Sequence, residues 1–414
     1  MRLFHKFDSS NLGWTFVVIF FVLGFCLRLV VFIEPHREGD ELIYRALVNQ
    51  LDNNNGYTLQ GTTLLEDGII DRDEYDHPLF FHPPGGIGLF WLFYRVLGYW
   101  GYPLIQVFSY VLFFWSMILL ASLIGLSSSN VGLVIVGGLS AFTPIMAHVT
   151  TNYWLDGPLL GFSTLAAVVF IWAVVRNSYL TACIAGVILG YASLIKITAF
   201  LIIPGITILS WIFLKPPKWG LFIRFCICLL LPAIIVQIPW EIWQWIKLGT
   251  PFPGWSGKPS ETLIASNRYV HYLTVIRSPW TYLSLTPRIV WTFIPCILLY
   301  IFLWHDKTIR WYGLSFFTWI FIVLSFHIAL GFLGYSKVIR YIILITPAST
   351  MLFSLLMPKA ISNLGFSKPF SARDMLSVII VGISGIAFLM EIATGIKSSF
   401  SYNADLIIPM FGNF

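Results

Sequence analysis

Ionisable side chains that could carry out chemistry stand at the ends of long apolar stretches in this sequence. Asp40, Glu41 and Asp156 are acids in such positions, and Lys196 and Arg340 are bases in such positions. A charge costs about 2.5–3.5 kcal/mol at the centre of a membrane helix, so ionisable residues at helix ends are candidates for function. The bases suit an anionic head group, and a carboxylate suits removal of a proton from an acceptor. The set therefore predicts group transfer from a membrane-bound phosphate ester.

The composition requires a membrane environment for the elements that position these residues. Of 414 residues, 57% are hydrophobic and 11% are charged, and the mean hydropathy is +0.81. Soluble globular domains carry about 25% charged residues, so this class is excluded. The formal net charge of +6 agrees with the basic cytoplasmic loops of membrane proteins. We therefore expect membrane lipids as partners and no nucleic acid.

Apolar stretches of spanning length recur along the sequence, separated by short polar breaks. A helix needs about 20 mostly apolar residues to cross a bilayer, so we predict an all-α polytopic membrane protein with about eleven transmembrane helices. The first stretch is too long for the apolar part of a signal peptide, and no small-residue cleavage site follows it. We expect it to be retained as a span. The predicted spans are 14–33, 103–124, 131–147, 156–175, 179–195, 197–214, 221–240, 287–304, 311–333, 341–357 and 375–394.

Charged breaks between the spans predict their orientation. Lys and Arg near helix ends mark the cytoplasmic side of a membrane protein. Basic residues occur at the N-terminus and in alternate breaks, at 176–177, 215–224, 305–310 and 359–373. The first long loop, residues 35–85, carries ten of the nineteen acids in the chain, so we place it outside. The same alternation places the C-terminal tail outside.

The apolar segment 85–100 does not fit a complete span. It is short, contains four glycines and carries Arg95. These features favour an interfacial or re-entrant helix. With this segment on the external side, Asp156 faces outward together with Asp40.

The predicted topology gives one catalytic unit followed by further spans. Residues 1–350 form a transmembrane core that includes the external loops 35–85 and 241–286. Residues 351–414 add C-terminal spans and a short external tail, and we expect no separate soluble domain. At the start of the second external loop, three tryptophans surround Glu241 and either frame an acceptor groove or anchor the helix at the lipid interface. They are Trp240, Trp243 and Trp245.

Five dispersed motifs fall on the predicted external side. They are Gly39-Asp40-Glu41-Leu-Ile-Tyr44 followed by Gly56-Tyr57, then His82-Pro83-Pro84, Trp154-Leu-Asp156-Gly-Pro158, Ala192-Ser-Leu-Ile-Lys196 and Arg340-Tyr341-Ile-Ile-Leu-Ile-Thr-Pro347. In this order the series resembles the polyprenyl-phosphate-sugar glycosyltransferases of the GT-C class, which include protein O-mannosyltransferases and the lipid A aminoarabinose transferase. The resemblance covers most of residues 1–350.

The resemblance implies a GT-C-like fold and an outward-facing site that takes a sugar from a polyprenyl-phosphate donor. It implies Asp40 as catalytic base with Glu41 and Asp156 as supporting carboxylates, and donor-phosphate contacts from His82, Lys196, Arg340 and Tyr341. The acceptor is a lipid, a glycan or a protein, and the setting is a bacterial inner or plasma membrane that builds the cell envelope. Some relatives carry a large C-terminal soluble domain, whose absence here leaves acceptor recognition to the loops. Some relatives bind a divalent metal, but the sequence offers no full ligand set and the metal question stays open.

Simpler structural roles compete with each assignment. The two acids at 40–41 suit the first turn of any helix, and Asp156 before Gly-Pro suits a helix N-cap. Lys196 and Arg340 could extend along the apolar surface to water, and His82 could be only a turn residue. Two other functions also remain. A transporter or flippase for a lipid-linked sugar would show repeated halves or broken helices near mid-membrane, and the sequence indicates neither. A non-catalytic subunit would bind the lipid-linked glycan without turning it over.

Overall fold

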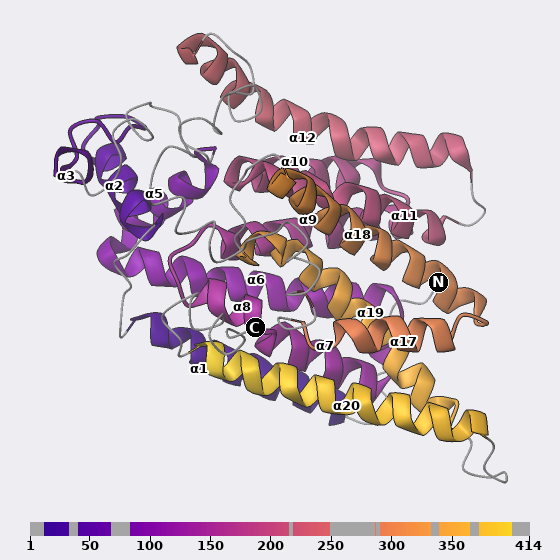
Figure 1. Cartoon of the computed structure of the whole chain (residues 1–414). Helices are drawn as coiled ribbons and strands as arrows, with labels where there is room; N and C mark the ends of the chain where they lie inside the picture. Colours follow the sequence, from indigo (N-terminus) through magenta and orange to yellow (C-terminus); the bar gives the residue numbers. More distant parts are fainter. Residues whose placement is uncertain are drawn as a thin grey trace.

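The computed structural model shows an all-helical protein. It describes residues 12–32, 40–67, 83–214, 218–248, 286, 290–332, 339–364 and 372–399. Within these ranges the regular elements are α-helices and short 3-10 helices, without a β-strand. The predicted all-α polytopic fold is confirmed (Figure 1).

The α-helices follow one another through short turns. Those before residue 150 are α1 (Leu12–Arg28), α2 (Asp40–Asp52), α3 (Thr63–Glu66), α5 (Gly85–Leu97), α6 (Gly101–Leu123), α7 (Asn130–Phe142) and α8 (Pro144–Thr150). Those after it are α9 (Asp156–Arg176), α10 (Tyr179–Ile195), α11 (Ile203–Phe213), α12 (Trp219–Leu248), α17 (Phe293–Phe302), α18 (Lys307–Phe332), α19 (Thr346–Ser362) and α20 (Ala372–Ser399). The 3-10 helices are η1 (Leu29–Phe32), η2 (Gly98–Trp100), η3 (Leu126–Ser128), η4 (Ile197–Ile202) and η5 (Ile339–Ile345).

The helices have the length and apolarity of membrane spans, and the chain is an integral membrane protein. Within the described ranges, six helical stretches can cross a bilayer by length and composition, and the bent pair α7 and α8 would add a seventh. Four shorter apolar helices, Leu12–Arg28, Tyr179–Ile195, Ile197–Phe213 and Phe293–Phe302, complete the set. Every predicted span overlaps one of these helices. Several boundaries differ by a few residues, and the largest difference is at α12, which continues through Glu241 to Leu248, so the start of the predicted external loop 241–286 is helical.

The short helix expected at 85–100 forms as α5 and is separate from α6. Gly98 has a φ of 59°, a conformation that a glycine adopts without strain, and the chain turns there. A Cβ atom on Gly101 would lie 2.5 Å from the carbonyl carbon of Phe93, so the start of α6 folds back against α5. On its other side α5 packs on α2, where Arg95 forms an ion pair with Asp52 at 2.9 Å. The position of α5 at the lipid interface stays a prediction.

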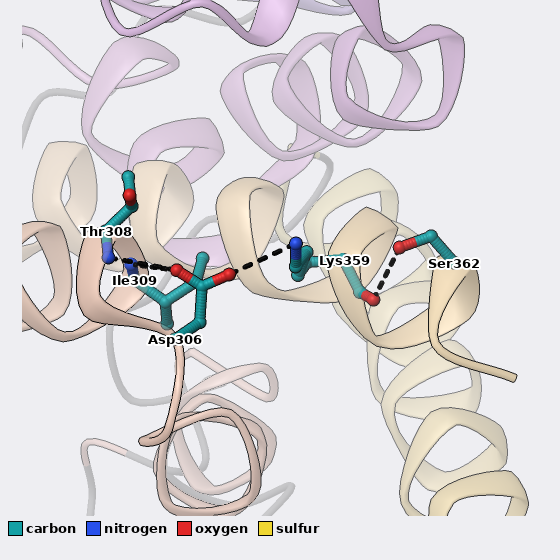
Figure 2. A network of polar contacts seen from close by, with 5 residues as sticks. All are labelled: Asp306, Thr308, Ile309, Lys359 and Ser362. Atoms are coloured by element: carbon teal, nitrogen blue, oxygen red, sulfur yellow. Dashed lines mark hydrogen bonds and ion pairs between the residues drawn. The ribbon is translucent and has the colours of Figure 1, made fainter.

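The spanning helices run side by side, and their turns gather at two ends of the bundle (Figure 1). One end, called here the α2 end, carries α2, α3 and α5, and there Arg28 of α1 bonds to Thr150 of α8. At the opposite end, called here the basic end, Lys359 of α19 pairs with Asp306 before α18 (Figure 2). The α9–α10 turn and the start of α12, which carry other basic breaks, also lie at that end (Figure 1). Which end faces the cytoplasm stays a prediction.

A buried acid joins three helices where α7 bends into α8. The two helices meet at 44°, and Pro144 cannot donate the backbone hydrogen bond that would continue α7. Glu391 of α20 is 1% exposed and accepts hydrogen bonds from Thr143 Oγ1 at 2.9 Å and from Thr292 N and Oγ1 at 3.0 and 2.8 Å. Gly395 brings the α20 backbone against the carbonyl of Phe142. Glu391 therefore fixes the bend from which α8 leads to the α2 end.

Candidate functional site

The centre of the candidate site is the turn between α8 and α9, called here the hub segment, residues 148–156. All of its residues are buried except Trp154, which is partly exposed. The backbone is not helical from Thr151 to Leu155. Backbone N–H and C=O groups in a buried turn need hydrogen-bond partners, because water cannot supply them there. The hub segment therefore has to be held by side chains from other helices.

Two of these side chains come from α1 and α6. Arg28 is fully buried, and its Nε donates a hydrogen bond to Thr150 Oγ1 at 3.0 Å. The guanidinium of Arg28 also lies 4.4 Å from the centre of the Tyr110 ring, which offers a cation–π contact. Gln106 Nε2 donates to the carbonyl of Trp154 at 2.9 Å. The two bonds fix both the entry and the exit of the turn.

The third side chain is Glu41, in the first turn of α2. Glu41 is 1% exposed, and its Oε1 accepts the backbone N–H of Tyr153 at 2.7 Å. Its neighbour Asp40 begins the helix and is partly exposed. Both acids are favourable at a helix N-terminus, as the structural alternative for them supposed. Their surroundings differ, however: Glu41 is buried and hydrogen-bonded to the hub segment, whereas Asp40 is partly exposed.

Arg45, one turn after Glu41 on α2, was not singled out from the sequence. Its guanidinium carbon lies 5.3, 5.6 and 4.9 Å from the ring centres of Tyr99, Tyr102 and Tyr153. Burial raises the pKa of Tyr153, which keeps the phenol neutral beside the cation. The spacing of four residues from Glu41, on one face of a helix, is the only sequence signal that could have drawn attention to Arg45. Both side chains attach α2 to the hub segment.

The fourth contact is a buried ion pair between Asp156 and Lys196. Lys196 Nζ lies 2.7 Å from Asp156 Oδ1, and the side chains are 7% and 1% exposed. Asp156 is the first residue of α9, and Leu155 occupies the N-cap position, so the alternative role of Asp156 as an N-cap is wrong. Lys196 follows α10 as its C-cap. Because Lys196 is buried against an acid, the alternative in which it extends to water is also wrong.

Pro83 and Pro84 form the turn before α5, called here the proline corner, which lies in the same region. Tyr191 of α10 donates a hydrogen bond to the carbonyl of Gly85 at 3.1 Å. A Cβ atom on Gly85 would lie 2.7 Å from Leu194, and one on Gly86 would lie 2.6 Å from Leu155. Only residues without a side chain allow this approach. The α2 motif, the proline corner, the Asp156 motif and the Lys196 motif therefore meet at the α2 end.

The remaining predicted residues are only partly within the described structure. The helix η5, which carries Arg340 and Tyr341, packs against α8, α9 and η4, next to the hub segment. The side chains of Arg340 and Tyr341 lie outside the described part of the chain, and so does all of His82. Their roles stay predictions. In the part of the chain that the structure describes, no three His, Cys, Asp or Glu residues are grouped to hold a metal ion.

No protein-family model and no curated protein matches the chain. Among solved structures, the chain is similar to the crystal structure of the Archaeoglobus fulgidus oligosaccharyltransferase in complex with Zn and sulfate. The two sequences are 13% identical, and the TM-score is 0.48. The similarity covers 93% of this chain and 54% of that chain, so this chain spans about half the length of that protein.

Proposed function

We propose that this protein is a membrane glycosyltransferase that moves a sugar from a polyprenyl-phosphate donor to a lipid, glycan or protein acceptor. The observation that supports it best is the meeting of four separate motifs at one buried hub segment. Glu41 of α2 contacts this segment, and Asp156 of α9 pairs with Lys196 at the end of α10. Acids and a base of this kind support the proposed chemistry. The helix that carries the fifth motif, η5, packs beside them.

In this proposal Asp40 is the general base. It is the partly exposed acid of the α2 motif, so an acceptor hydroxyl can reach it, whereas Glu41 is buried and holds the hub segment. Asp40 takes the proton of the acceptor while the acceptor oxygen bonds to the anomeric carbon. The bond between that carbon and the phosphate oxygen breaks, and the polyprenyl phosphate leaves with the electron pair. A single displacement of this kind inverts the anomeric centre.

The leaving phosphate gains negative charge, and Lys196 is the cation proposed to meet it. The ammonium group is held by Asp156 at 2.7 Å, so a donor phosphate would share Lys196 with Asp156 or replace it. We assign further phosphate contacts to His82, Arg340 and Tyr341. With the basic end in the cytoplasm, the site would face outward across a bacterial inner or plasma membrane.

One observation favours the second candidate, a transporter or flippase for a lipid-linked sugar. The bend between α7 and α8 is a broken helix of the kind that transporters use near their binding sites. Here, however, the bend is held by Glu391 and packed against α20. A bend fixed by these contacts favours an enzyme with a rigid site over a transporter, whose helices must move.

The test uses the purified full chain in lipid nanodiscs, a panel of polyprenyl-phosphate sugars and a crude membrane acceptor. Asp40→Asn should lower sugar transfer by a factor of about 10²–10⁴, the usual effect of losing a general base, while the unfolding temperature stays unchanged. Asp52→Asn is the matched control, because Asp52 ends the same helix that Asp40 begins and pairs with the exposed Arg95. Transfer that survives in Asp40→Asn would refute the base assignment. Movement of labelled donor across liposomes without any transfer would favour the transporter.

A further inference from the structure

The outer part of α12 carries a cluster of aromatic rings at the α2 end. Trp240 and Trp243 stack with ring centres 4.9 Å apart and planes 15° apart. Tyr57, from the loop after α2, meets Trp240 edge-on at 6.0 Å. Trp240 is only 7% exposed, so it packs inside the protein instead of lying among lipids. By contrast, Trp245 is 59% exposed and fits a lipid-interface anchor.

Three polar side chains beside these rings are linked by hydrogen bonds. Ser193 Oγ lies 3.0 Å from Gln237 Oε1, and Gln237 Nε2 donates to Glu241 Oε1 at 2.8 Å. Ser193 and Gln237 are buried in the seam between α10 and α12. The second carboxylate oxygen of Glu241 is shielded from solvent and has no hydrogen-bond partner in the described part of the chain. Buried carboxylate oxygens are normally hydrogen-bonded, so this oxygen of Glu241 is suited to accept a hydrogen bond from a ligand.

The cluster is held close to the end of α10. A Cβ atom on Gly190 would lie 2.8 Å from the carbonyl of Ala233, so α10 and α12 touch through their backbones one turn before Ser193. Lys196 follows Ser193 by three residues at the end of α10. On its other side α12 exposes apolar residues such as Ile234 and Ile238, which suits contact with lipid tails. A lipid-linked ligand with its phosphate at Lys196 would therefore have its head group near the cluster.

From this geometry we propose that Tyr57, Trp240, Trp243 and Glu241 bind the sugar ring of the lipid-linked donor. The inference rests on the proposed function, which supplies a sugar as the transferred group. The C–H faces of a pyranose ring pack on aromatic rings, and the carboxylate of Glu241 accepts hydrogen bonds from neighbouring sugar hydroxyls. A few polar groups among aromatic walls are the usual means of fixing a ligand and its identity. This cluster thus determines which sugar the protein takes.

The experiment compares two radiolabelled probes, a polyprenyl-phosphate sugar that the protein transfers and the same polyprenyl phosphate without the sugar. Binding is measured with the full chain in nanodiscs. Trp243→Ala should weaken binding of the sugar-bearing lipid about tenfold and leave the sugar-free lipid unchanged. Trp243→Phe, which keeps an aromatic face, should restore most of the loss. Glu241→Gln should weaken only the sugar-bearing lipid, and Trp245→Ala is the matched control that should change neither.

The outcomes separate this inference from the function on which it rests. Equal loss of both lipids in Trp243→Ala, or no loss of either, would overturn the sugar-binding role while transfer by the unaltered chain upheld the proposed function. An aromatic variant that binds no better than Trp243→Ala would also overturn it. If the unaltered chain neither binds nor transfers any donor of the panel, the proposed function fails and the inference fails with it.

Discussion

Two ion pairs of the same chemical kind lie at opposite ends of the bundle, in opposite surroundings. At the α2 end, Asp156 and Lys196 are 2.7 Å apart with side chains 1% and 7% exposed. At the basic end, Asp306 and Lys359 are 3.1 Å apart with side chains 29% and 44% exposed (Figure 2). Burial of two charges costs several kcal/mol per ion before their attraction repays it, whereas an exposed pair costs and gains little. The buried pair is therefore the one that a functional role best explains.

The largest effect should come from breaking the buried pair on one side. Lys196→Met leaves Asp156 buried without its cation, which should destabilise the protein by about 3–5 kcal/mol. The double variant Lys196→Met with Asp156→Leu removes both charges and should recover most of that stability without recovering sugar transfer. Thermal unfolding in nanodiscs and the transfer assay measure the two effects. An unchanged unfolding temperature in the single variant would contradict the buried pairing, and transfer by the double variant would remove both residues from the mechanism.

A smaller effect is expected from Glu391, a buried acid that is satisfied by neutral donors instead of a cation. Glu391→Leu deprives Thr292 N and Oγ1 of their acceptor, at about 1–3 kcal/mol for each group left unpaired, whereas Thr143 Oγ1 can still donate to the carbonyl of Leu139 at 2.8 Å. Partial relaxation should limit the total loss of stability to about 3 kcal/mol. Glu391→Gln keeps an acceptor and should lose less. Urea unfolding followed by tryptophan fluorescence measures the free energy of unfolding of both variants. An equal loss of stability in Glu391→Gln and Glu391→Leu would contradict the prediction.

The smallest effect belongs to the exposed pair. Asp306 Oδ1 accepts the backbone N–H groups of Thr308 and Ile309 at 2.9 and 3.2 Å and so caps α18 (Figure 2). Asp306→Ala should therefore cost about 1 kcal/mol at neutral pH, and Lys359→Met, which keeps the cap, about 0–1 kcal/mol.

The cap also makes a prediction about pH. The backbone hydrogen bond from Ile309, helped by Thr308 and Lys359, lowers the pKa of Asp306 below its ordinary value of 3.8. A lowered pKa in the folded state means that the stabilisation is present above the ordinary pKa and is lost as the pH falls below it. The stability difference between the unaltered chain and Asp306→Ala should thus shrink below about pH 4. A difference that stays constant down to pH 3 would show that the carboxylate is not the cap.

Much of the fold could be predicted from the sequence because hydropathy alone decides where a chain can cross lipid. The eleven predicted spans all overlap helices, and the glycines of 85–100 together with Arg95 correctly indicated a separate short helix. The end of α12 was missed because Trp240 to Leu248 is less apolar than a span, although helical hydrogen bonds continue through it.

The sequence predicted which residues lie at the candidate site, but not which of them contact one another. Charge placement put Asp40, Asp156 and Lys196 at one end, but nothing in a spacing of 40 residues says that Asp156 and Lys196 touch. The contact depends on how α9 and α10 pack. Glu391 was missed for the same reason, because its partners are 99 and 248 residues away. Contacts of this range are set by tertiary packing, which a local pattern does not contain.

The long reach of Glu391 has a consequence for how the protein is made. A chain leaves the ribosome from its N-terminus, so Thr143 enters the membrane 248 residues before the acid that will bind it. At about 5–20 residues per second, the ribosome makes Thr143 on the order of 10–50 seconds before Glu391. During that interval the nascent chain has α7 and α8 but not the contact with α20 that holds the bend between them. The contact between Thr143 and Glu391 therefore forms only after α20 has been made, late in the folding of the bundle.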